Sequence, residues 1–266
     1  MLLITRINNY KVYVLILLSF SVTIINFEDT ILSAFAQENN LPFDKTVEFN
    51  LSDDEVTKKF WDWSHNLSVK EIPDSSNPSK ETECVIHIDK SKKVVILLDP
   101  YFLGKITQKC NLPVGYHIIV PIYNAHCDTG QIGTEKYSFE ELLKCAKEAD
   151  KGELLVKMDI DNTNFIDYKA SVGNSPPNEY IVEVESSKNE NSTIPPNSRG
   201  ITSGMYAKPG TYSSASHGWF AIIPPLLEGQ HTLSYRIEVV ATGDLLLKAD
   251  EWNFVSDINY IFDVKK

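Results

Sequence analysis

The chain has 266 residues, of which 42% are hydrophobic, and a formal net charge of −11 at pH 7. Such an acidic chain is a poor partner for nucleic acid and for anionic membrane surfaces, because both repel negative charge. Its four cysteines, Cys84, Cys110, Cys127 and Cys145, form an even set that is typical of disulfides in an oxidising compartment.

Residues 1–36 have the pattern of an export signal. Arg6 and Lys11 accompany an apolar run from Val12 to Ile25, and Ala34-Phe-Ala36 is a typical cleavage site, so the mature chain would begin at Gln37. The run is shorter than the ~20 residues that span a bilayer. The long gap between the run and the cleavage site leaves an uncleaved N-terminal membrane anchor as the alternative. We therefore expect a secreted or cell-surface protein.

Two helices are predicted after a polar lead-in at 37–51. A capping box, with serine first and glutamate three residues on, occurs at Ser52–Glu55 and again at Ser138–Glu141. Apolar residues recur at helical spacing behind each box, which predicts helices over 53–66 and over 139–150. The second helix carries Cys145.

The other periodic segments indicate short β-strands. The clearest stretch is His217–Val239, in which an apolar run ends at Pro224-Pro225 and an alternating run follows Gly229. Pro121 indicates an edge position or a bulge, and Asp161-Asn162 a hairpin turn. The predicted strands are 84–89, 94–98, 117–123, 154–160, 165–171, 180–184, 219–223, 233–239, 245–247 and 258–264. The segments 110–115, 124–130 and 186–216 are predicted as a turn, a polar loop and a long surface loop.

Strands follow strands in this order, which favours antiparallel sheets. We predict an all-β, antiparallel two-sheet sandwich of jelly-roll or immunoglobulin-like type with two peripheral helices. It would form a single domain over 52–266. Three disulfide pairings are possible, and we favour Cys84–Cys110 with Cys127–Cys145, because each joins nearest neighbours in the sequence.

A string of landmarks runs along residues 60–235. The landmarks are Trp61 and Trp63, Asn77-Pro78, Cys84, Cys110 with Pro113 and Gly115, Pro121 with Asn124, Cys127-Asp128, Gly218-Trp219, Pro225-Leu226, and Gly229 with His231. This string resembles a family of uncharacterised exported proteins of bacteria and archaea, and the resemblance implies one exported domain and no established reaction. The family pattern has a glycine after Asp161, where Asn162 also tolerates positive φ.

The most site-like string is around His126-Cys-Asp128. Asn124, His126 and Asp128 alternate and so would point one way, and His117 lies upstream. Such a set is able to bind a cation or to act as an acid–base pair. The alternative is a polar loop held by a disulfide.

Trp61 and Trp219 are candidates for an aromatic platform that binds a sugar or a peptide. The alternative places both rings in the core, where aromatic side chains are more common. Trp63 lies on the apolar stripe of the first helix and favours the core.

Other motifs are weak or absent. Asp159–Asp167 resembles a calcium loop but lacks its glycine and its final glutamate, so a hairpin fits better. No catalytic, metal or cofactor motif appears, and we predict no cofactor. Asn50, Asn66 and Asn191 begin N-x-S/T sequons and are glycan candidates.

These observations predict an exported, disulfide-stabilised, non-catalytic module that binds a surface glycan, a peptide or a neighbouring protein. One alternative is a secreted hydrolase that uses Asp128 with His126 or His117. Another is a structural domain stabilised by calcium.

Overall fold

The computed structural model describes residues 41–71, 81–98, 105–131, 133–149, 152–171, 179–198, 201, 206–241 and 252–266. The chain divides into two compact units, Met1–Pro42 and Phe43–Lys266, and all the elements below belong to the second. The predicted signal segment and the predicted strand at 245–247 lie outside the described residues. Within the described part, no helix is long and apolar enough to cross a membrane.

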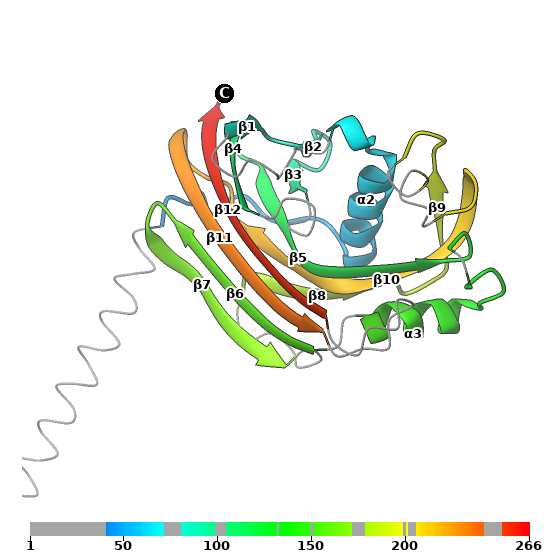
Figure 1. Ribbon diagram of the computed structural model, residues 1–266. Coiled ribbons are helices and arrows are strands. Elements are labelled where there is room, and N and C mark those ends of the chain that lie inside the picture. Colours follow the sequence, from blue (N-terminus) through cyan, green and yellow to red (C-terminus); the bar gives the residue numbers. More distant parts are fainter. Residues whose placement is uncertain are drawn as a thin grey trace, which may run out of the picture. The chain divides into compact units, whose positions relative to one another are not determined.

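Two sheets pack against each other in the second unit (Figure 1). Tyr235 joins them, because its hydroxyl donates to the carbonyl oxygen of Pro121 in the opposite sheet at 3.0 Å. The first sheet has the order β1 (Glu81–Glu83), β4 (Lys105–Pro113), β12 (Trp252–Lys265), β11 (Gly229–Ala241), β6 (Gly152–Ile160), β7 (Thr163–Ser171). The second has the order β2 (Ile86–Asp89), β3 (Val94–Leu97), β5 (His117–Asp128), β10 (Gly210–Ile223), β8 (Ile181–Glu185), with β9 (Glu190–Ile194) beside the first part of β10. The predicted all-β two-sheet sandwich with two helices is confirmed.

Most strand pairs are antiparallel, but three are parallel. β4 is parallel to β1 and to β12, and β3 is parallel to β5. The chain leaves the second sheet after β3, adds β4 to the first sheet and returns as β5. This excursion provides the long crossover that parallel neighbours need, since a tight turn joins only antiparallel strands.

The stretch His217–Val239 connects the two sheets. β10 ends before Pro224-Pro225, which cannot donate to a strand ladder, and β11 begins at Gly229 with φ +143°. Consecutive strands therefore lie in opposite sheets at the centre of the sandwich. The residues of β11 that were predicted to face inward are all buried: Leu233, Tyr235, Ile237 and Val239.

The two helices cover opposite faces of the second sheet (Figure 1). α2 (Asp53–Asn66) begins with the predicted capping box and packs Val56 and Phe60 against that sheet. Trp63 packs at the edge of this cluster, as expected for a residue on the apolar stripe. α3 (Phe139–Ala149) packs Leu142 and Ala146 against β5 and β10 from the other side. A short 3-10 helix, η1 (Val69–Glu71), follows α2.

Both predicted disulfides are confirmed. Cys84–Cys110 ties the segment before β2 to β4, and Cys127–Cys145 ties β5 to α3. The predicted hairpin between β6 and β7 also forms. Asp161 and Asn162 have φ of 51° and 62°, the left-handed pair that a type I′ turn requires.

Three segments that were predicted as irregular contain strand, so these three predictions are wrong. Residues 110–113 complete β4, residues 124–128 extend β5, and 190–194 and 210–216 belong to β9 and β10. Their inward positions carry polar or sulfur-containing side chains such as Cys110, Asp128 and Ser214, which are all buried. The apolar alternation that predicts a strand is therefore missing from them.

Candidate functional site

The polar half of β5 faces α2 because the strand contains a bulge. Its register against β10 shifts between Pro121 and Tyr123, which confirms the irregularity predicted at the proline. One extra residue turns the following side chains to the other face of the sheet. Before the bulge, Ile119 packs in the cluster beneath α2. The residues turned toward α2 after it are Asn124, His126 and Asp128.

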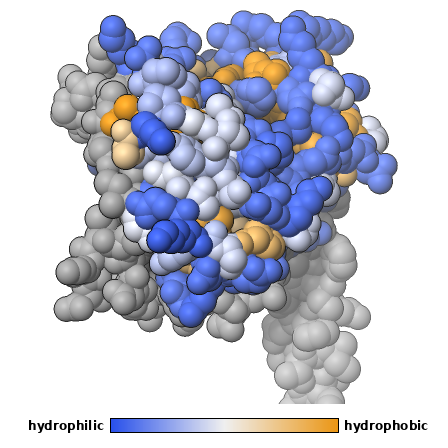
Figure 2. All heavy atoms as spheres, turned by 90° about the vertical axis from the view of Figure 1, so that its right-hand side faces the viewer, coloured by the Kyte–Doolittle hydropathy of each residue, from blue (hydrophilic) through white to orange (hydrophobic). Residues whose placement is uncertain are grey.

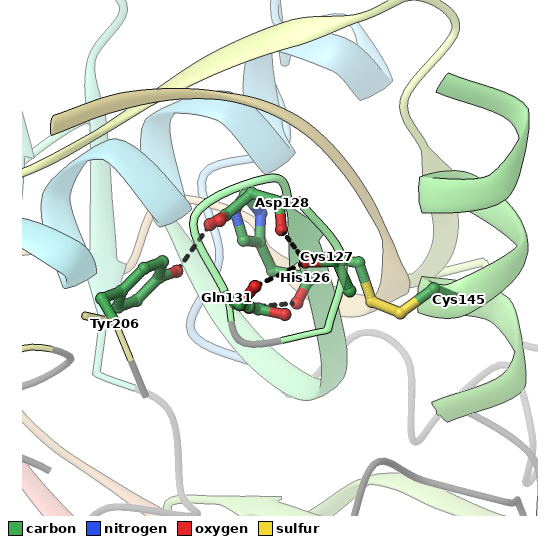
Figure 3. The surroundings of a disulfide bond; sticks show 7 residues. His126, Cys127, Asp128, Gln131, Cys145 and Tyr206 are labelled. Carbon is green, nitrogen blue, oxygen red and sulfur yellow. Dashed lines mark hydrogen bonds and ion pairs between the residues drawn. A yellow bond between two sulfur atoms is a disulfide. The ribbon is translucent and has the colours of Figure 1, made fainter. Parts of the chain in front are cut away.

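Asp128 is the centre of the site, and its carboxylate is enclosed (Figure 3). Oδ2 lies 3.2 Å from His126 Nε2 and accepts from the Tyr206 hydroxyl at 2.6 Å. Oδ1 accepts from the backbone N–H of Gly130 at 2.7 Å. The side chains of His126 and Asp128 are only 3% and 0% exposed. Both carboxylate oxygens are thus used inside the protein, where they hold the turn after β5 and the segment at Tyr206.

Aromatic and imidazole rings from α2 cover this pair. The Trp61 ring lies over His126 with centroids 4.9 Å apart, and the His65 ring meets His126 edge-on at 4.7 Å. His65 Nδ1 lies 2.9 Å from Ser192 Oγ on β9. We call the set of Trp61, His65, His126, Asp128, Ser192 and Tyr206 the polar layer.

Burial controls the charges in the polar layer. Loss of water around the ring, and then the nearby His126, lower the pKa of His65 to about 3, against the opposing effect of Asp128. Burial would raise the pKa of Asp128, but hydrogen bonds from His126, Tyr206 and Gly130 outweigh it, so that this pKa lies below its ordinary value. Burial and the neighbouring carboxylate raise the pKa of the Tyr206 phenol. At neutral pH the polar layer therefore contains an ionised Asp128 and a neutral His65.

Small residues on β10 make room for the polar layer. Ser214 pairs with Asp128 on one side and with Glu190 on the other, and Ser216 pairs with His126. Gly218 pairs with Asn124, and a Cβ there would lie 2.6 Å from the carbonyl oxygen of Tyr123 and would meet the Asn124 amide oxygen. A larger residue at position 218 would push β5 and β10 apart.

Glu190 lies at the edge of the polar layer. Burial raises the pKa of its carboxyl to about 7, Lys58 opposes this effect, and Asp54 and Asp62 add to it. Asp54 also holds the turn before β9, because it accepts from the N–H and the hydroxyl of Ser187. The contact between α2 and β9 therefore includes several acidic groups.

The structure brings together four of the six predicted site residues: Trp61, Asn124, His126 and Asp128. Trp219 has the opposite orientation on β10, is 1% exposed in the core and shares no surface with Trp61. His117 begins β5, whereas Asp128 ends it, so the two lie roughly 35 Å apart at 3.3 Å per residue. His117 instead packs against Phe49 with ring centroids 5.3 Å apart.

No cation site emerges from the described ranges, in which no three His, Cys, Asp or Glu side chains converge on one point. In the segment that resembles a calcium loop, the Asp161 carboxylate is used internally. It lies 2.7 Å from His231 Nδ1 and accepts from the N–H of Thr232 at 2.8 Å. That segment forms the hairpin turn described above.

Sequence reasoning missed several members of the polar layer. His65 lies four residues after Trp61 on α2, and this helical spacing was an available signal. Tyr206, Ser192 and Glu190 lie in the segment predicted as a long loop, and no local pattern places them beside β5. The pairing of β9 with β10 places Ser192 and Glu190 there, and a bridge between Gln131 and Tyr206 places the tyrosine.

Comparisons with known proteins add little. No protein-family model matches the chain, and no curated protein matches it. Among solved structures, a crystal structure of a mutant of the CFA/I enterotoxigenic E. coli adhesin CfaE aligns with 54% of this chain and 35% of that chain, at 9% identity and a TM-score of 0.16. The chain thus spans about a third of that adhesin's length, and the similarity is too low to support an argument about fold or function.

Proposed function

We propose that this protein is an exported, non-catalytic binding module whose partner is a surface glycan, a peptide or a neighbouring protein. The observation that carries the proposal is the enclosure of the His126–Asp128 pair. With side chains 3% and 0% exposed and both carboxylate oxygens occupied, the pair stabilises the fold and does not meet a substrate.

The disulfides support the exported part of the proposal. Two bridges that each join elements of one sandwich are typical of chains that fold in oxidising surroundings. N-terminal sequencing of the natural protein tests this part. We expect a mature chain that begins at Gln37, and a protein that keeps residues 1–36 would instead support the membrane anchor.

The character of the surface favours a polar partner. The face shown in Figure 2 is mostly hydrophilic or neutral, with apolar residues in small separate groups. The large hydrophobic side chains that are exposed in the described part lie on separate elements: Ile88, Tyr137, Leu227 and Val255. A large apolar contact would be expected to show a continuous patch instead.

A thermal-shift panel of the oxidised chain from Gln37 tests the binding function. A ligand at about 100 times its dissociation constant adds about 2.7 kcal/mol of stability, which is several degrees in Tm for a chain of this size. We expect such a shift with at least one glycan, peptidoglycan fragment or surface protein. A panel without any binder contradicts the proposal. An EDTA arm tests the calcium alternative, which requires a lower Tm on chelation.

Hydrolysis assays on the same protein test the catalytic alternative. We expect no turnover of ester, glycoside or peptide substrates. Turnover that His126→Gln abolishes, in a variant that stays folded by circular dichroism, would establish the hydrolase instead.

A further inference from the structure

The last turn of α2 places the imidazole of His65 against β5 and β9, beside the packing of Trp61 and Trp63 on the apolar cluster beneath the helix. β9 pairs with β10 over five residues, and Ser192 on it meets His65. The first half of α2 is held differently, by its capping box and by the buried Val56 and Phe60. A change in charge at this contact is therefore expected to affect the last turn of the helix more than its first half.

Two imidazole rings meet edge-on in this contact, and the nearby carboxylate is bonded to one of them. The ring centroids of His65 and His126 are 4.7 Å apart, and Asp128 is already engaged by His126 and Tyr206. A proton on His65 would add a positive charge beside His126 without a free counter-charge. A charge in this enclosed position destabilises the closed state, whereas exposure to water removes the cost.

The other charged groups near the contact do not compensate that proton. On α2, Asp62 is paired with Lys58 at 2.6 Å and Asp54 holds Ser187. On β9, burial raises the pKa of Glu190 to about 7, so this carboxyl becomes neutral in the pH range in which His65 would become charged. On β10, the facing residues are the serines at 214 and 216 and Tyr212.

We propose that His65 and His126 form a proton-sensitive latch, in which protonation of His65 releases the last turn of α2 from β5 and from β9 while the sandwich stays folded. The open state would expose the polar layer, including Trp61 and the His126–Asp128 pair. This inference goes beyond the proposed function, because it concerns the folded chain alone and holds whether or not a binding partner is found.

Hydrogen exchange measured by mass spectrometry on the disulfide-intact chain tests the latch between pH 7.5 and 4.5. Rates are corrected for the intrinsic pH dependence with an unfolded control. The Glu190→Gln variant is the background for this experiment, because burial raises the pKa of Glu190 to about 7 and its protonation favours the closed state over the same pH range. If opening is coupled to the proton on His65, the opening equilibrium of amides in 61–68 then rises about tenfold for each pH unit below 6.5. Amides in β11 and β12, on the other sheet, should keep their protection.

Variants assign the effect to His65. His65→Gln keeps a neutral hydrogen-bonding side chain opposite Ser192 and should remove the pH dependence. His87→Gln is the control for the other imidazole beside this turn, because His87 on β2 lies against Trp63 at 5.9 Å. In the same background it should keep the slope.

Three results would overturn the latch: no slope at 61–68 in the Glu190→Gln background, a slope that persists when His65→Gln is added, or an equal slope in β11 and β12, which indicates global unfolding. If His65→Gln does not fold, imidazole ¹⁵N shifts of the wild type decide the question. The latch requires that His65 stays neutral in the closed state, and a closed state with a charged His65 would refute it.

Discussion

Two histidine–aspartate pairs at opposite ends of this sandwich show how position decides what the same chemistry does. His231 and Asp161 lie 2.7 Å apart at the β6–β7 turn, with side chains 10% and 37% exposed. His126 and Asp128 lie 3.2 Å apart beneath α2, with side chains 3% and 0% exposed. The first pair stabilises a turn that is in contact with water, whereas the second lies at the centre of the polar layer.

The difference indicates that the shorter distance does not identify the pair with the larger expected contribution to stability. At the turn, water reaches the Asp161 carboxylate, so the loss of its charge is expected to cost little stability. Beneath α2, each group depends on the other, because an unpaired charge or donor there has no access to water. The same comparison is the reason why we expect a structural role for the more active-looking motif, His126-Cys-Asp128.

The largest difference between the two pairs is expected when one charge is removed from each of them. Asp128→Asn should lower the free energy of unfolding by about 3–5 kcal/mol, because it disrupts a buried hydrogen-bonded charge pair. Asp161→Asn should lower it by about 0–1 kcal/mol, because that pair is partly exposed. Urea unfolding of the oxidised protein measures both values. Equal effects would show that the buried pair has no special role.

A smaller effect is expected from crowding the strand opposite Asn124. Gly218→Ala should cost about 1–3 kcal/mol in unfolding free energy, because its Cβ would lie 2.6 Å from a backbone oxygen that cannot swing away. Gly210→Ala is the matched control on the same strand. Its Cβ would meet only the far end of the Tyr212 side chain, at 3.0 Å. A cost for Gly210→Ala as large as that for Gly218→Ala would contradict the packing described here.

The smallest effect is a pH dependence at the edge of the polar layer. Since the pKa of Glu190 is raised from 4.5 to about 7 in the folded chain, its contribution to stability is fully present below pH 4.5 and is lost as pH rises through 7. Glu190→Gln removes this loss, so the variant should gain about 1–2 kcal/mol over wild type at pH 7.5 relative to pH 4.5. Unfolding curves at the two pH values measure it. A gain that does not change with pH would mean that Glu190 is ionised in the fold as readily as in water.

Much of the fold could be predicted because local chemistry specifies it. The two capping boxes locate the starts of α2 and α3, and the predicted bounds of α2 match the observed ones. Nearest-neighbour pairing gave both disulfides. The alternation in β11 faces a hydrocarbon core, so it is visible in the sequence.

Only part of the polar layer could be predicted, because the strand faces that build it carry hydrophilic side chains and lack apolar alternation. Where β5, β9 and β10 face α2, their inward residues are His126, Asp128, Ser192 and Ser214, which make hydrophilic patterns typical of loops. The alternation of His126 and Asp128 correctly indicated a shared face. The partners Tyr206 and His65 come from segments far apart in the chain, and only the packing of α2 and the bridge between Gln131 and Tyr206 bring them there.

The most direct test of the central claim is the reactivity of individual histidines toward diethylpyrocarbonate at pH 7, read by mass spectrometry on the folded, oxidised chain. Enclosure of the polar layer predicts that His126 stays unmodified while His87, which is partly exposed on β2, is modified. Unfolding in urea should make both reactive. Modification of His126 as fast as His87 in the folded protein would show that the site is open to solvent, which would contradict the structural role of the pair and favour the hydrolase.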